Sequence, residues 1–181
     1  MPVIGPPVVA IVGRSGSGKT TLLSRVIPSL RSRGLKVGVV KHHGHATSFD
    51  TPGKDTHRMS EAGAEVVVGV SSEQVAVFTP RREIDWLAQA APFVGHANLV
   101  LAEGFSQSQL PKIEVHRSGR SDSLLSAPED LLAIVSDVDW DLDLPTFTPD
   151  QIEQVADFLV ELLGSQLEAH ELAEPDVPPD A

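Results

Sequence analysis

Hydrophobic residues in this chain gather in short runs that polar, glycine-containing stretches separate. Strand-like segments, which are rich in valine, isoleucine and leucine or alternate apolar with polar residues, span residues 8–12, 35–40, 66–70, 75–78, 99–102, 112–117 and 131–135. The uninterrupted apolar runs are typical of strands that are buried on both faces of a parallel sheet. Segments 66–70 and 75–78 flank Ser71-Ser72-Glu73, so they are expected to form an antiparallel hairpin or two neighbouring strands.

Apolar residues recur at helical spacing between several of these segments. A helix is expected from 20 to 33, kinked or shortened by Pro28 and ended by Gly34. A short helix is expected to lead from residue 54 to Gly63, and Thr79-Pro80 marks the start of another that reaches about residue 91. Thr148-Pro149-Asp150-Gln151 combines a capping box with proline at the first helical position, so the last helix is expected over 149–163.

The alternation of strands and helices predicts an α/β fold of three layers. A mostly parallel sheet is expected, with helices on both faces and the ligand site at the carboxyl ends of the strands. Residues 1–163 are predicted to form one nucleotide-binding domain. Residues 164–181 carry acidic residues and prolines without a basic residue, so this segment is predicted to be a disordered tail.

One motif stands directly behind the first strand-like segment. Residues 13–20 fit the phosphate-binding loop (P-loop) pattern G-x-x-x-x-G-K-[ST] at every fixed position. Glycines let backbone N–H groups wrap a phosphate, and the helix that follows directs its positive end towards it. Lys19 is expected to reach the β- and γ-phosphates and Thr20 to ligate Mg²⁺. The nucleotide-binding residues predicted here are Gly13, Arg14, Ser15, Gly16, Ser17, Gly18, Lys19, Thr20 and Thr21.

Four acidic residues are candidates to complete this site. Glu103 follows a buried strand, where a carboxylate can hold Mg²⁺ directly or through water; the alternative is a surface acid. Asp50 lies in the loop after the second strand and is a second candidate metal ligand, while Asp55 in the same loop also suits a helix start. Lys19, Asp50 and Glu103 are therefore the candidate catalytic residues. Asp137, after the last strand, is a candidate acceptor for guanine.

The segment Lys41-His42-His43-Gly44-His45 follows the second strand. Its imidazoles could contact a phosphate or substrate, could serve structural roles, or could bind a transition metal. Without cysteine in the chain, no thiolate zinc site or nucleophile is available, and nothing resembles a serine hydrolase triad.

Charge and hydropathy narrow the class of partner. The net charge is −11, and all 14 lysines and arginines lie at or before Arg120. The acidic back half argues against a nucleic-acid partner, whose binding needs concentrated positive charge. No apolar run approaches the roughly 18 residues of a membrane span, and the N-terminus has no basic signal region, so a cytoplasmic protein is expected.

Several motifs resemble the molybdopterin-guanine dinucleotide biosynthesis accessory protein B family. They occur in the family's order from about Val8 to Asp137: the P-loop, Lys41-His42-His43-Gly44-His45, residues 50–58, Ala62-Gly63-Ala64, Glu103-Gly104-Phe105 and residues 111–115. The resemblance implies a homodimeric, GTP-binding P-loop protein with weak Mg²⁺-dependent GTPase activity. It also implies an accessory role beside the guanylyltransferase that joins GMP to molybdopterin, with molybdopterin as a further candidate ligand.

One position departs from the family pattern. The family commonly has a basic residue after Glu-Gly-Phe, whereas Ser106 stands here, which puts a phosphate or partner contact from this position in doubt. Two other functions fit parts of the sequence. A small-molecule kinase would use ATP and consume it only with an acceptor present. A metal-delivery GTPase would bind metal through His42, His43 and His45.

Overall fold

The computed structural model describes residues 6–43, 47–79, 90–92 and 94–171, the last six of these by their backbone alone. Contacts divide the chain into two compact units, residues 1–42 with 90–181 and residues 43–89, a division that the sequence does not predict.

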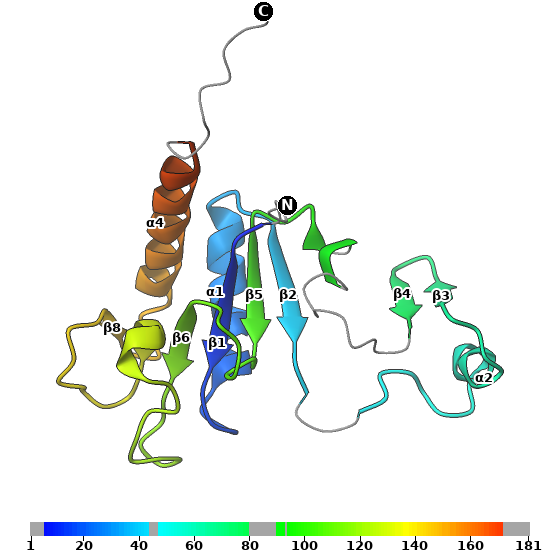
Figure 1. The fold of residues 1–181 in the computed structure, drawn as a ribbon, viewed down its shortest axis with the longest axis horizontal. Helices are drawn as coiled ribbons and strands as arrows, with labels where there is room; N and C mark the ends of the chain where they lie inside the picture. Colours follow the sequence, from blue (N-terminus) through cyan, green and yellow to red (C-terminus); the bar gives the residue numbers. More distant parts are fainter. Residues whose placement is uncertain (1–5, 44–46, 80–89, 93, 172–181) are drawn as a thin grey trace, which may run out of the picture. The chain divides into compact units, whose positions relative to one another are not determined.

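The first unit is built on a six-stranded sheet in the order β2-β5-β1-β6-β7-β8 (Figure 1). Every neighbouring pair is parallel. The strands are β1 (Val8–Val12), β2 (Val37–Lys41), β5 (Leu99–Glu103), β6 (Lys112–Val115), β7 (Leu131–Val135) and β8 (Thr146–Phe147). The predicted parallel sheet is thus confirmed, whereas the two-residue β8 was not predicted because so short an apolar segment has no recognisable period.

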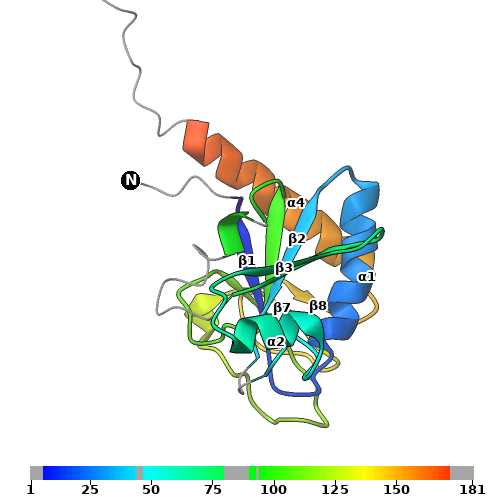
Figure 2. The same ribbon diagram turned by 90° about the vertical axis from the view of Figure 1, so that its right-hand side faces the viewer.

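Helices cover both faces of this sheet. Helix α1 (Lys19–Ser32) and helix α4 (Ile152–Glu171) pack on one face, where their apolar residues join the odd-numbered positions of β1 and β5 in one core. On the other face, the helical residues 90–92 and 94 bring Val94 against Gly38 of β2. Figure 2 shows α1 and this short helical segment on opposite sides of the sheet. The three predicted layers are present.

Helix α1 continues through Pro28, which the sequence suggested would kink or shorten it. Pro28 lies on the exposed side of the helix, while Leu22, Leu23, Val26 and Leu30 face the core. Burying each of these side chains contributes roughly 2 kcal/mol, which together outweighs the roughly 3 kcal/mol cost of an interior proline. Gly34 follows the helix with φ of +85°, as expected of a C-terminal cap.

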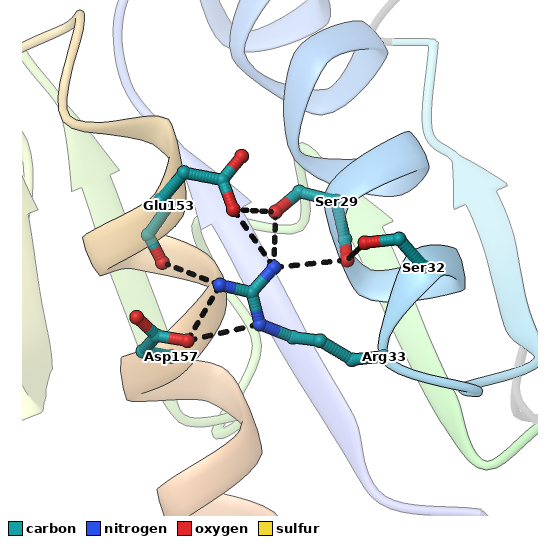
Figure 3. Close-up of polar contacts among 5 residues, drawn as sticks. All are labelled: Ser29, Ser32, Arg33, Glu153 and Asp157. Atoms are coloured by element: carbon teal, nitrogen blue, oxygen red, sulfur yellow. Dashed lines mark hydrogen bonds and ion pairs between the residues drawn. The ribbon is translucent and has the colours of Figure 1, made fainter.

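The C-terminal part of α1 is joined to α4 by a polar cluster (Figure 3). The Arg33 guanidinium donates to Glu153 Oε2 at 2.9 Å and to Asp157 Oδ1 at 2.6 Å. The Ser29 hydroxyl donates to the same Glu153 oxygen at 2.9 Å. This cluster fixes the second helix against the first at their solvent-facing seam.

Helix α4 starts and ends later than the sequence predicts. Its first residue is Ile152, because residues 149 and 150 form a turn. The predicted capping-box contact is nevertheless present, since Gln151 Oε1 accepts from the Thr148 backbone N–H at 2.7 Å. The helix continues past Gly164 to Glu171, so part of the predicted tail is helical, and residues 172–181 lie outside the described residues. None of the described helices is long and apolar enough to cross a membrane.

Strand β6 carries two charged residues whose side chains are buried. Lys112 is 3% exposed and its ammonium lies 3.6 Å from Asp130 Oδ2. Glu114 is 1% exposed and accepts from the backbone N–H groups of Leu125 and Ser126 at 2.6 and 2.9 Å. Because a buried charge is costly without partners, these contacts hold the loop before β7 in place. Both residues belong to the family-specific segment 111–115 and serve the fold.

The second unit contains helix α2 (Asp55–Glu61) and an antiparallel hairpin of β3 (Val67–Val70) and β4 (Val75–Phe78). The predicted hairpin is confirmed, with its turn at Ser71–Gln74. The helix predicted from Thr79-Pro80 lies outside the described residues except at its end, where residues 90–92 and 94 are helical.

Candidate nucleotide-binding site

The loop between β1 and α1 has the backbone of a phosphate-binding loop. Gly13, Gly16 and Gly18 have φ of +138°, +76° and +104°. A methyl group on Gly13 would lie 2.2 Å from the carbonyl oxygen of Val115, so no larger residue fits there. Gly18 is the N-cap of α1, which has no side-chain cap and no acidic residue in its first turn. The positive end of the helix is therefore available to an anion.

Lys19 is the first residue of α1, and its side chain lies back across this loop. Its ammonium donates to the carbonyl oxygens of Gly13 and Arg14 at 2.8 and 2.9 Å. Burial lowers the pKa of Lys19, the Glu103 carboxylate opposes this shift, and the charge of Lys41 adds to it. The carbonyls keep the side chain folded along the loop, where the sequence places it for phosphate contact.

Thr20 and Glu103 meet as the sequence predicts. The Thr20 hydroxyl donates to both oxygens of Glu103, at 2.9 and 3.0 Å. Glu103 is 7% exposed and is the last residue of β5. The strand is therefore one residue longer than the sequence predicts, since the predicted strand ends at residue 102. A hydroxyl and a carboxylate form the kind of oxygen donor set that Mg²⁺ takes in proteins.

Lys41 completes this arrangement and was not singled out as a site residue. Its ammonium lies 3.0 Å from Glu103 Oε1 and 3.4 Å from Thr20 Oγ1. The same two side chains thus already hold a cation in the free protein, which supports their fit to a metal ion. The sheet register is what identifies Lys41 as part of the site, because Lys41 and Glu103 are paired residues at the ends of the parallel strands β2 and β5.

Ser17, within the loop, and Asp137, after β7, share one cavity. Both line an open cavity of about 230 Å³ together with Thr21, Arg25 and Arg117. Ser17 is 2% exposed and its hydroxyl has no hydrogen-bond partner in the described part of the chain. An orphaned buried hydroxyl inside a phosphate loop fits a missing ligand.

The Asp137 carboxylate is already engaged by the neighbouring loop. The backbone N–H of Ser118 donates to Oδ1 at 2.8 Å and the Ser118 hydroxyl to Oδ2 at 3.3 Å. The first of these bonds is the main reason that the pKa of Asp137 is lowered, with Arg117 contributing less. Asp137 is therefore beside the loop as an ionised acceptor. Its role towards guanine stays a prediction.

The connection after β6 places two arginines over the phosphate loop. A methyl group on Gly16 would lie 3.1 Å from Arg120 Nε, and one on Gly18 would lie 3.7 Å from a terminal nitrogen of Arg117. Arg14 Nε also donates to the Ser121 hydroxyl at 2.8 Å. The position of this connection could not be predicted, because the alternating pattern suggests a strand to residue 117, whereas β6 ends at Val115.

Asp50 lies in the second unit, and its metal role stays a prediction. Oδ1 accepts from the Thr51 backbone N–H at 2.8 Å and from the Thr56 hydroxyl at 2.9 Å. Oδ2 is buried without a hydrogen-bond partner in the described part of the chain. The carboxylate therefore shapes the turn before α2 and leaves one buried oxygen without a hydrogen-bond partner among the described residues. Asp55 begins α2, the helix-start position that the sequence offered as its alternative.

The histidines after β2 do not form a cluster in the described part of the chain. The His42 ring lies 5.1 Å from the Phe105 ring, and the His43 ring lies 5.1 Å from that of Phe49. His45 lies outside the described residues. Within residues 6–43, 47–79, 90–92 and 94–171, no group of three or more histidines, aspartates or glutamates is placed to hold a metal. Ser106 lies in a turn after Gly104 and Phe105.

Comparison with known proteins identifies relatives of this chain. A protein of Haemophilus influenzae named molybdopterin-guanine dinucleotide biosynthesis adapter protein is 38% identical over 156 residues, covering 84% of this chain and 87% of that protein. An Escherichia coli protein of the same name is 34% identical over 170 residues, covering 88% and 95%. The crystal structure of Bacillus subtilis MobB superposes with a TM-score of 0.68 at 28% identity, covering 87% and 97%.

These similarities agree with the architecture described above. The shared fold is a mostly parallel six-stranded sheet with helices, of the P-loop NTPase type. The family model of molybdopterin guanine dinucleotide synthesis protein B matches residues 8–137, the span over which the sequence motifs occur. The chain therefore belongs to the molybdopterin guanine dinucleotide synthesis protein B family.

Proposed function

We propose that this protein binds GTP with Mg²⁺ and acts in the cytoplasm as an adapter in molybdopterin-guanine dinucleotide biosynthesis. The adapter role follows the names of the relatives from two bacteria. The observation that carries the nucleotide is the uncapped N-terminus of α1, which the glycine loop, Lys19 and the Thr20–Glu103 pair surround. The protein would assist the guanylyltransferase that attaches GMP to molybdopterin, with molybdopterin as a further ligand.

Each part of the site has a distinct task in this proposal. The backbone N–H groups of residues 13–21 and the Lys19 ammonium bind the phosphates. Thr20 and Glu103 hold Mg²⁺, directly or through water, and Asp50 is a further candidate ligand. Bound Mg²⁺ neutralises charge on the phosphates. Asp137, held ionised by Ser118, accepts from the guanine N1–H and amino groups.

The metal site implies a movement of Lys41. Its ammonium contacts the same oxygens that Mg²⁺ needs, so it has to leave Glu103 and Thr20 when the metal binds. The terminal phosphate then offers it a negative partner. We infer weak hydrolysis at this site, in which water attacks the γ-phosphate, the bond from the γ-phosphorus to the bridging oxygen breaks, and GDP and inorganic phosphate leave. The adapter role remains the main function in this proposal.

A second copy of the chain is the proposed partner of the β3–β4 hairpin. The strands and their flanks expose Val66, Val68, Val70, Val75 and Val77, with 36% to 75% of each residue accessible. Isolated two-stranded hairpins are marginally stable, and contiguous apolar surface of this kind marks an interface. A homodimer through this hairpin would bury it. Light scattering should give twice the mass of the chain for the wild type and the mass of one chain for Val70→Lys.

Equilibrium binding of GTP and ATP with Mg²⁺ tests the nucleotide proposal. We expect the wild type to prefer GTP and Lys19→Ala to lose affinity by about 100-fold, because a charge-assisted contact to phosphate is worth up to about 3 kcal/mol. Arg31→Ala, at an exposed position in the last turn of α1, is the matched control. Preference for ATP would favour a small-molecule kinase, and binding that is unchanged in Lys19→Ala would contradict the site assignment.

A further inference from the structure

We propose that Arg120 binds the phosphates of the nucleotide, as an arginine that the chain itself supplies from the connection between β6 and β7. The proposal rests on the proposed function, since it names a further phosphate ligand at the same site. Its basis is the position of the Arg120 side chain, the way its backbone is anchored, and the absence of a competing carboxylate in the described part of the chain.

The Arg120 guanidinium lies against the exposed tip of the phosphate loop. A methyl group on Gly16 would lie 3.1 Å from Nε, 3.2 Å from Cζ and 3.3 Å from a terminal nitrogen of this side chain. Gly16 stands in the middle of the loop whose backbone would wrap the phosphates, so a cation in contact with it lies within reach of them. A residue larger than glycine at position 16 would push this arginine away.

The backbone that carries Arg120 is fixed by a buried histidine. His116 is 4% exposed, and its Nε2 lies 2.9 Å from the carbonyl oxygen of Ser121. A carbonyl only accepts, so Nε2 carries the proton and Nδ1 accepts from the Ser136 hydroxyl at 3.2 Å. The ring of Trp140 packs against the same imidazole nearly at a right angle. The turn after β6 therefore has a firm attachment one residue beyond Arg120.

Two more contacts tie this turn to itself and to the phosphate loop. The Arg120 backbone N–H donates to the carbonyl of Arg117 at 2.9 Å, which closes the turn. Arg14, inside the phosphate loop, donates to the Ser121 hydroxyl at 2.8 Å. Arg120 is thus held between two fixed points, and its side chain extends from an ordered backbone.

The chemistry of the side chain suits a phosphate. Guanidinium groups present paired donors that match phosphate oxygens, and an arginine supplied in cis stabilises charge on transferring phosphates in other nucleotide-binding proteins. Among the described residues, Arg120 forms no ion pair or side-chain hydrogen bond, whereas Arg33 is fully engaged by carboxylates. Arg14 donates to Ser121. Arg117 likewise forms no ion pair or side-chain hydrogen bond among the described residues, but of the two it is Arg120 that lies against Gly16 in the middle of the loop.

Calorimetric titration of GTP, GDP and GMP at fixed Mg²⁺ tests this assignment in the full-length protein. We expect Arg120→Ala to weaken GTP binding at least tenfold, Arg120→Lys to recover part of that affinity, and GMP binding to be unaffected. A loss confined to GTP would assign the contact to the γ-phosphate, and a loss shared with GDP would assign it to the β-phosphate. Arg31→Ala is the control for loss of one exposed positive charge.

The outcome separates this proposal from the function on which it rests. If the wild type binds GTP and Lys19→Ala does not, the nucleotide site stands. Arg120→Ala binding within twofold of wild type would then overturn the role of Arg120 alone. Failure of the wild type to bind GTP would overturn the proposed function itself. Unchanged thermal unfolding of Arg120→Ala would show that this exposed side chain does not act through folding.

Discussion

The two ends of helix α1 differ in whether their polar groups have partners within the chain. At its C-terminal end, Arg33, Glu153 and Asp157 satisfy one another across the seam with α4 (Figure 3). At its N-terminal end, the helix has neither a side-chain cap nor an acidic residue in the first turn, and the buried Ser17 hydroxyl has no partner in the described part of the chain.

This difference separates a structural cluster from a binding site. Polar residues that serve the fold alone find partners within the chain, because an unsatisfied buried group costs roughly 1–3 kcal/mol. A set that leaves N–H groups and a hydroxyl open retains that cost in the free protein. A ligand can remove it, so the open end of α1 is the end at which substitutions should change binding.

Substitution of one glycine near each end of α1 should give the largest difference in the free energy of unfolding. We expect Gly13→Ala to reduce the free energy of unfolding by about 3 kcal/mol or more, because its methyl group would lie 2.2 Å from the Val115 carbonyl oxygen. Gly34→Ala should cost about 1–2 kcal/mol, the strain of positive φ alone, because nothing lies within 4 Å of the added methyl group. Urea unfolding of the two variants measures both values.

Equal losses in the two alanine variants would mean that the backbone at Gly13 shifts to make room. The contrast between a tightly enclosed loop and an open helix end would then fail. In that case the glycine would be there for the ligand rather than for the fold, and Gly13→Ala should still weaken GTP binding.

Charge removal at each end should separate metal binding from stability. We expect Glu103→Gln to weaken binding of GTP in Mg²⁺ by about tenfold, because a neutral amide is a poorer metal ligand than a carboxylate. Binding of GTP in excess EDTA should change little, since the amide touches no phosphate. Glu153→Gln at the closed end is the control. Mg²⁺ titrations of GTP affinity give the comparison.

Equal weakening with and without Mg²⁺ would contradict a metal role for Glu103. It would indicate instead that the carboxylate acts through Lys41, whose ammonium lies 3.0 Å from it. Lys41→Met would then reproduce the effect of Glu103→Gln, whereas under the metal assignment it removes a competitor for the site.

The main elements of the sheet could be predicted because each depends on local pattern. The bounds of β1, β4 and β7 agree with the apolar runs residue for residue. The limits of α4 could not be predicted in this way. A glycine such as Gly164 favours the end of a helix but does not require it, and α4 continues through Gly164 to Glu171. Strand β8 forms because it pairs with β7, and its own two residues are too few to predict a strand.

The site was predictable as far as a motif could fix the residues. Lys19, Thr20 and Glu103 come together because a phosphate loop and the end of a neighbouring strand share one edge of the sheet. Lys41 and Arg120 were not predicted as ligands. Their positions depend on strand register and on a turn held by His116, which are contacts between residues far apart in the sequence.

The smallest effect is expected from titrating the closed end. The Ser29 hydroxyl first, and Arg33 second, lower the pKa of Glu153. The unfolded chain therefore takes up this proton first, near pH 4.3. The carboxylate stabilises the fold above that pH and loses its contribution as the pH falls through the lower folded value. The Tm of wild type should exceed that of Glu153→Gln slightly from pH 7 to 5, with the gap closing below pH 4. A gap that persists at pH 3 would mean that glutamine disturbs packing, and the closed end would not depend on charge.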